Sequence, residues 1–102
     1  MKAAKNNKMF EFSNMERFII SGNEAAEFLQ HVLTENALDL DILQGQYTKI
    51  QNEHGWDLDE AYLYRFYEDA YLLVVNSSNA ENDWQYLNKE IRNYYAVIKI
   101  VK

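Results

Sequence analysis

The sequence contains no cysteine, no proline and only three glycines among its 102 residues. The absence of cysteine excludes a disulfide framework, a zinc ribbon, a CxxC redox site and a cysteine nucleophile. With so few glycines there is neither a GxGxxG nor a GxxxxGKS/T loop, so the usual backbone cradles for nucleotide phosphates are missing. No proline-rich or low-complexity stretch marks a linker, and the length fits one domain.

Positive charge and long apolar runs are also scarce. Ten Lys and Arg residues against sixteen Asp and Glu residues give a formal charge of −6, and the pI is near 4.8. A grip on the phosphate backbone needs clustered positive charge, so we expect no nucleic-acid partner. No stretch approaches the roughly 20 apolar residues that span a bilayer, and no signal-peptide pattern follows the N-terminus. The sequence therefore predicts a cytoplasmic protein with no membrane association.

What the sequence does contain is enough apolar material for a core. Hydrophobic residues make up 48% of the chain and aromatic residues 15%, including eight tyrosines. This composition offsets the entropic cost of ordering the chain. The polar, lysine-rich residues 1–8 predict a flexible tail, and residues 9–102 predict a single domain.

Hydrophobic periodicity predicts a strand and then a helix in the first third of the chain. Residues 9–21 favour an extended backbone and include the apolar run Phe18-Ile19-Ile20, which is typical of a buried strand. Apolar residues then recur at three- and four-residue spacing from Ala25, which predicts an amphipathic helix ending near Asn36. The acidic and aliphatic residues 37–46 are expected to form a packed loop.

Three short apolar runs separated by turn-forming residues predict consecutive antiparallel strands at 47–51, 58–66 and 71–75. Ser78 and Glu81 fit a capping box at the start of a second helix. The apolar stripe of that helix runs through Ala80, Trp84, Leu87, Ile91 and Tyr94. We expect Trp84 to belong to the core. Residues 97–101 predict a final β-branched strand.

This order of elements defines the expected fold class. The pattern β-α-β-β-β-α-β predicts an α+β domain with a mostly antiparallel sheet and two helices packed on one face. Such a sheet leaves its other face bare, which favours a possible homodimer.

Two groups of side chains are candidates for chemistry. Asp57, Asp59 and Glu60 crowd the start of a strand, where like charges can drive one pKa upward, although a solvated acidic turn is the commoner arrangement. His31 and His54 lack metal-ligand spacing, so no metal site is expected. The eight tyrosines suit a flat heteroaromatic ligand, or they pack under a helix; both alternatives stay open.

Four segments in register resemble one family over roughly residues 9–101. The first segment, FEFSNMERFIISGNEAAEFLQHVLTEN, resembles DLSHMG…V.G.DA..FLQ…TND. The second segment, GQYT followed by NEHG, is similar to G..QYT….NE.GG. The third, DEAYLYR, is similar to DDL.VYR. The fourth, YLLVVNSSNAENDW, is similar to YLLVVNA.N.EKDW. The family is the glycine cleavage T-protein, an aminomethyltransferase.

The resemblance implies a fold that binds tetrahydrofolate, with the pteridine in a pocket of this domain. Family members take an aminomethyl group from the lipoyl arm of a carrier protein, release ammonia and leave methylenetetrahydrofolate. The implied cofactor is therefore tetrahydrofolate, and the implied partner is a lipoyl carrier protein. Glu60 falls on the family's catalytic aspartate, which positions and activates the folate. The implied cofactor-binding residues are Met15, Tyr47, Tyr64 and Asn76.

The chain departs from the family pattern at Glu60, which replaces an aspartate, at Trp56, which replaces a glycine, and at Asn14, which replaces a histidine. Family enzymes are also much longer, and their remaining domains supply further folate contacts, so we expect this chain alone not to be a complete enzyme. Two alternatives remain: a non-catalytic interaction module that keeps the fold, and a folate-binding domain of the tRNA-modifying GTPase type. Convergence of the implied residues on one concavity favours folate binding, whereas a pocket plugged by Trp56 favours the interaction module.

The predicted strands also give a test of the implied site. A hairpin turn at residues 67–70 places Glu60 opposite Asn76 on the adjacent antiparallel strand. We therefore predict that these two residues are cross-strand neighbours.

Overall fold

The computed structural model describes residues 15–101 of the chain. The predicted tail at 1–8 and the predicted beginning of the first strand at 9–14 lie outside the described residues. The first strand is therefore described from Met15 onward.

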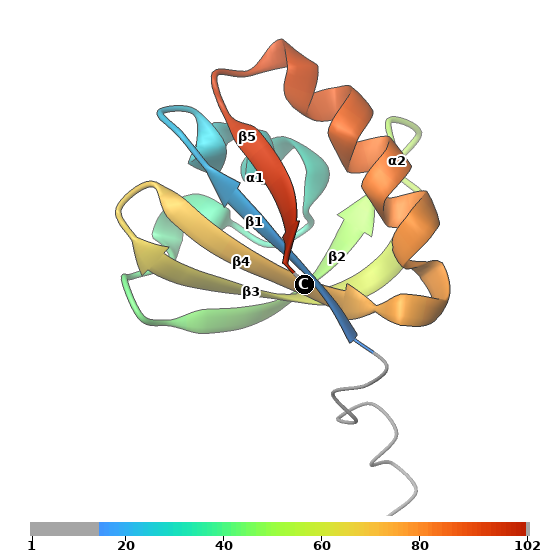
Figure 1. Ribbon diagram of the computed structural model, residues 1–102, viewed down its shortest axis with the longest axis horizontal. Coiled ribbons are helices and arrows are strands. Elements are labelled where there is room, and N and C mark those ends of the chain that lie inside the picture. Colours follow the sequence, from blue (N-terminus) through green and yellow to red (C-terminus); the bar gives the residue numbers. More distant parts are fainter. Residues whose placement is uncertain (1–14, 102) are drawn as a thin grey trace, which may run out of the picture.

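Five strands form one antiparallel sheet in the order β2-β3-β4-β1-β5. Figure 1 shows them side by side as a twisted sheet, with the last strand next to the first. The strands are β1 (Met15–Ser21), β2 (Gly45–Gln51), β3 (Asp57–Tyr67), β4 (Ala70–Asn76) and β5 (Val97–Val101). With two intervening helices the element order is β-α-β-β-β-α-β, which confirms the predicted α+β class.

Helices α1 (Ala25–Val32) and α2 (Ala80–Glu90) cover one face of this sheet. Residues along each strand alternate between its two faces, and in β4 the buried positions are Tyr71, Leu73 and Val75. These side chains share a single core cluster with apolar residues of both helices, including Phe28, Leu29 and Leu87. The opposite face, termed the outer face, carries no helix of the described residues.

The first helix ends earlier than predicted. It stops at Val32 rather than near Asn36, because Leu33 has extended backbone angles and pairs with Ile50 of β2. The backbone N–H of Thr34 then donates to the carbonyl of Lys49 at 3.0 Å. Sheet pairing therefore takes over the chain at a point where hydrophobic spacing alone still fits a helix.

The predicted capping box at the start of α2 is wrong. The N-cap residue is Asn79, and no side-chain hydrogen bond caps the helix there. Instead the Asn76 side chain accepts a hydrogen bond from the N–H of Ser78 at 3.0 Å, at the short 3-10 turn that precedes α2. The helix ends at Glu90, so Tyr94 lies beyond it, but its ring still packs 5.6 Å from that of Phe28.

Arg65 fastens the loop before β2 to the β3–β4 hairpin. Its guanidinium donates to the carbonyls of Leu40 at 2.7 Å and Glu68 at 2.6 Å. Its backbone N–H donates to the carbonyl of Gln44 at 3.0 Å, and its carbonyl accepts from the N–H of Leu43 at 2.6 Å. These contacts fix the point at which β2 begins.

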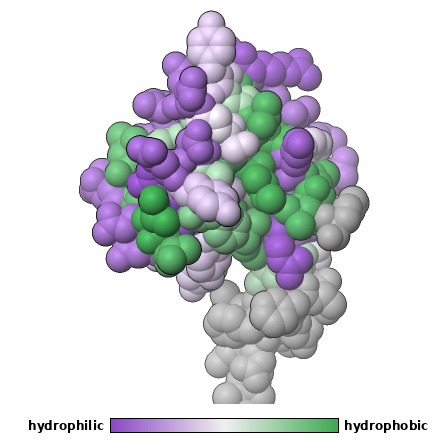
Figure 2. Space-filling view, turned by 60° about the vertical axis from the view of Figure 1, so that its left-hand side comes forward, coloured by the Kyte–Doolittle hydropathy of each residue, from purple (hydrophilic) through white to green (hydrophobic). Residues whose placement is uncertain are grey.

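The surface is uneven in hydropathy. Figure 2 shows hydrophobic side chains gathered in patches among hydrophilic ones. The exposed large hydrophobic residues include Leu38, Ile42 and Leu43 in the loop before β2, and Val97 and Ile100 in β5. No helix within residues 15–101 is long and apolar enough to cross a membrane.

Candidate functional site

The outer face holds a cavity of about 940 Å³, which is in the size range of small-molecule sites. Its walls come from β1, β2, β3 and β4. All five residues that the family resemblance implies line this cavity: Met15, Tyr47, Glu60, Tyr64 and Asn76. They come from four strands, so only the sheet brings them together. Their roles remain predictions.

Strand register explains this convergence. Met15 pairs with Asn76 across β1 and β4, and Tyr47 pairs with Tyr62 across β2 and β3. In the β3–β4 hairpin Ala61 pairs with Val75, and one further step in the same register sets Glu60 opposite Asn76. The hairpin geometry therefore agrees with the cross-strand prediction for these two residues, and both face the same cavity.

Three tyrosines form an aromatic wall of the cavity. The rings of Tyr47 and Tyr62 lie 5.7 Å apart in an edge-on arrangement, and those of Tyr62 and Tyr64 lie 6.5 Å apart and nearly parallel. Each of the three remains about 40% exposed. These tyrosines therefore do not pack under a helix, unlike Tyr71, which is buried in the core. Partly exposed parallel rings offer the surface that a flat heteroaromatic ligand needs.

Gly45 makes room for the Tyr64 ring. The two residues pair across β2 and β3, and a Cβ added at Gly45 would lie 2.5 Å from both Cδ1 and Cε1 of Tyr64. Any side chain at this position therefore displaces the ring. Glycine at residue 45 lets the tyrosine lie over the backbone of β2.

Charges of both signs surround the aromatic wall. Glu60 pairs across the strands with Lys49, whose Nζ lies 3.5 Å from Asp57 Oδ2. Burial, and next the charge of the Glu60 carboxylate, raise the pKa of Tyr47. A hydrogen bond from Gln51 lowers the pKa of Asp57. The cavity thus presents carboxylate acceptors and cationic donors near one another, which suits a polar ring edge.

The three crowded carboxylates lie on different faces of the sheet. A register shift at the end of β2 pairs Gln51 with Asp57 and Ile50 with Asp59, so Leu58 is the extra residue of a β-bulge. Asp57 therefore shares the outer face with Glu60, while Asp59 takes an inner position opposite buried Ile50. The crowding was expected to raise the pKa of one of these three carboxyl groups, but the pKa of Asp57 is lowered. The carboxyl group whose pKa is raised is that of Asp83 in α2, which faces Asp59.

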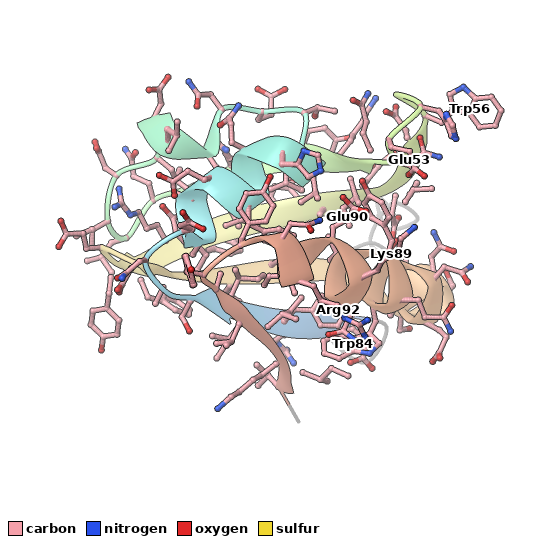
Figure 3. All side chains as sticks on the ribbon, turned by 90° about the horizontal axis from the view of Figure 1, so that it is seen from above. Glu53, Trp56, Trp84, Lys89, Glu90 and Arg92 are labelled. Atoms are coloured by element: carbon pink, nitrogen blue, oxygen red, sulfur yellow. The ribbon has the colours of Figure 1, made fainter. Side chains whose placement is uncertain are left out.

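Neither tryptophan lines the cavity. Trp56 is 72% exposed and projects away from the molecule at the tip of the β2–β3 turn (Figure 3). The Asn52 side chain accepts hydrogen bonds from the backbone N–H groups of His54 and Trp56, and thereby shapes that turn. Trp84 points from α2 toward β1, where its ring lies 5.6 Å from Phe18. Trp56 does not plug the site, and Trp84 packs against the core as predicted.

Sequence reasoning missed several residues of the cavity wall, among them Arg17, Lys49 and Leu72. The alternation that places Met15, Tyr47 and Asn76 on the outer face also places these residues there. That signal was present in the sequence. Within residues 15–101 no three His, Asp or Glu side chains are grouped to hold a metal ion.

Comparison with known proteins agrees with this fold. The model of the GCVT N-terminal domain family matches residues 1–102. An aminomethyltransferase of Phocaeicola vulgatus is 40% identical over 78 residues, which cover 76% of this chain and 22% of the relative. An aminomethyltransferase of Thermus thermophilus is 39% identical over 79 residues, covering 78% of this chain and 23% of the relative.

A solved structure shows the same likeness. The crystal structure of glycine cleavage system aminomethyltransferase T from Bartonella henselae superposes with a TM-score of 0.81 and 31% sequence identity. The match covers 85% of this chain and 24% of that one. The chain therefore shares its fold with that protein and belongs to the GCVT N-terminal domain family. It spans about a quarter of the length of the relatives it matches.

Proposed function

We propose that this chain binds tetrahydrofolate in the outer-face cavity. The observation that carries the proposal is the convergence of Met15, Tyr47, Glu60, Tyr64 and Asn76 on one cavity of about 940 Å³. The resemblance implied these residues from separate parts of the sequence, and strand pairing brings them together. The open access past Trp56 also favours a ligand site over a closed interaction module.

The side chains present fit the chemistry of a reduced pterin. The near-parallel rings of Tyr62 and Tyr64 supply an apolar surface for a flat heterocycle. The Glu60 carboxylate accepts hydrogen bonds from ring N–H groups, and the Asn76 amide both donates and accepts. Tetrahydrofolate, when bound, supplies the nitrogen that receives a one-carbon unit. Glu60 orients that ring and holds a carboxylate charge beside it.

We further propose that the one-carbon unit comes from an aminomethyl group on the lipoyl arm of a carrier protein. Support for this donor comes from the relatives, which are aminomethyltransferases, and from the glycine cleavage system named for the solved structure. The chain spans about a quarter of those proteins, so donor and carrier belong to the proposal.

Calorimetric titration with tetrahydrofolate under anaerobic conditions tests the binding proposal. We expect saturable binding to the wild-type chain, and at least about tenfold weaker binding to Glu60→Gln, because a hydrogen bond to a charged group contributes about 1.5–3 kcal/mol. The matched control is Glu68→Gln, which neutralises an exposed carboxylate in the β3–β4 turn and should bind like the wild type. Absence of binding to the folded wild-type chain contradicts the proposal and favours the interaction module.

A further inference from the structure

Asp83 is a fully buried acidic residue on the sheet-facing side of α2. Neither of its carboxyl oxygens, nor Oδ2 of Asp59, receives a hydrogen bond from any N–H or O–H donor within residues 15–101. The group that faces Asp83 is the Asp59 carboxyl of β3. Two other charged side chains, Glu16 of β1 and Arg65 of β3, occupy inner positions of the strands. Of these charged groups, only Asp59 acts on the pKa of Asp83.

Two facing carboxyl groups with three of their four oxygens lacking a donor need a proton between them. A pair of ionised carboxylates in a buried site repel each other and lose their hydration, whereas one protonated partner donates an O–H to the other. Burial, followed by the hydrogen bond and charge of Asp59, raises the pKa of Asp83 to about 9. Asp83 is therefore a neutral acid at neutral pH, and the pair carries one negative charge.

This pair lies directly beside the residue that enters the cavity. Oδ1 of Asp59 accepts a hydrogen bond of 2.8 Å from the backbone N–H of Glu60. A second contact links the start of α2 to the same segment of β3: Nδ2 of Asn79 donates a hydrogen bond to the carbonyl of Leu58 at 2.8 Å. The start of α2 thus holds the bulged segment of β3 at two points, Leu58 and Asp59.

We propose that Asp83 is a positioning residue, which as a neutral acid donates its proton to Asp59 and thereby fixes the Glu60 segment in the cavity. The bulge adds the unpaired residue Leu58 to β3 just before the Glu60 segment, so the contact from α2 holds the strand where its pairing with β2 is irregular. The role in orienting Glu60 toward a ligand rests on the proposed function. The shared proton does not, and it has its own test.

The shared proton is tested by the pH dependence of stability. The folded chain keeps the Asp83 proton up to about pH 9, whereas the unfolded chain releases it near the ordinary value of 3.8. Between these values folding takes up a proton, so the folding equilibrium constant falls about tenfold per pH unit from this residue. Asp83→Asn keeps an N–H donor for Asp59 and removes this dependence. We expect the variant to gain stability over the wild type steadily between about pH 5 and pH 8.

The control for that measurement is Asp69→Asn, an exposed turn residue that should follow the wild-type pH profile. A difference between Asp83→Asn and wild type that is constant with pH overturns the shared proton. Carbon NMR of the side-chain carboxyls gives a second readout on the unaltered chain. We expect one aspartic acid to remain protonated at pH 7 and to be missing from Asp83→Asn; finding every aspartate ionised overturns the proposal.

The positioning role is tested by tetrahydrofolate affinity. Asp83→Asn should bind within about twofold of the wild type, whereas Asp83→Leu, which has no donor, should bind at least about tenfold more weakly while keeping its far-ultraviolet circular dichroism. Equal affinities of the two variants overturn the positioning role, and so does an Asp83→Asn variant that binds as weakly as Asp83→Leu. If the wild type binds no tetrahydrofolate, the proposed function fails, and the pH profile still decides the shared proton.

Discussion

At the scale of single residues, the cavity depends on side chains that shape one another. The Tyr64 ring lies over Gly45, and Tyr62 stacks beside Tyr64. Glu60 lies next to Lys49 in the strand register, and burial together with the Glu60 charge raises the pKa of Tyr47. A change at a residue that never touches the ligand can therefore alter the site, because it moves a neighbour that does.

Gly45→Ala tests this coupling. The added methyl group requires the Tyr64 ring to move, so we expect tetrahydrofolate binding to weaken by about 1–2 kcal/mol with little loss of fold. The effect should disappear when Tyr64 is already replaced by alanine, because the clash is then absent. Calorimetric titration of both single variants and the double variant gives the coupling. Strictly additive losses contradict the interpretation of Gly45.

At the scale of elements, α2 packs on the inner face of the sheet and contacts the strands that carry the site. Trp84 packs on Phe18 of β1, and the Tyr86 hydroxyl donates to the carbonyl of Gln51 at 2.8 Å. Asn79, at the N-cap, holds the carbonyl of Leu58. One helix with its cap therefore contacts three strands, two of them through backbone carbonyls next to the β2–β3 turn.

Trp84→Ala measures how much this packing contributes. Removing a large aromatic side chain from a core costs about 3–5 kcal/mol, and because Trp84 is only partly buried we expect about 3 kcal/mol. Denaturant unfolding gives the value. The matched control is Trp56→Ala, an exposed turn residue that should change stability by about 0.5 kcal/mol or less. Loss of tetrahydrofolate binding at full stability would place Trp84 in the site instead.

At the scale of the whole molecule, the cavity belongs to one sheet and is open on the side away from it. The residues that line it come from strands β1 to β4, and none comes from a helix of the described residues. The chain also spans about a quarter of the aminomethyltransferases it resembles. One-carbon transfer needs a site that excludes water from the reacting groups and holds them in close register.

We therefore expect the 102-residue chain to bind tetrahydrofolate without catalysing one-carbon transfer to it. Incubation with tetrahydrofolate and a carrier protein loaded with an aminomethyl group should release no ammonia and form no methylenetetrahydrofolate above background. A full-length aminomethyltransferase under the same conditions is the positive control. Sustained product formation by the chain alone would show that the open cavity is sufficient for the reaction.

Much of the fold could be predicted from sequence because it follows from local periodicity. The alternation of β4 and the spacing in α2 each specify one buried face, and the order of elements then allows few arrangements. Prediction failed where local patterns compete with tertiary pairing. Leu33 and Thr34 fit the helical spacing but bond to β2. The predicted Ser78 cap of α2 is absent, and the Asn76 side chain instead caps the 3-10 turn that precedes the helix.

The candidate site divides in the same way. The sequence by itself determined which side chains share a face along the regularly paired part of each strand, and the family resemblance singled out five of them. Both alternation and motifs can be read along the chain without knowledge of the packed molecule. Only the tertiary structure decided that Asp57 and Asp59 lie on opposite faces and that Asp59 meets Asp83. The first result needs a bulge whose position depends on the partner strand. The meeting of Asp59 and Asp83 depends on the packing of a helix against a strand. That packing buries both carboxyl groups, and burial is a property of the packed molecule that no local pattern contains.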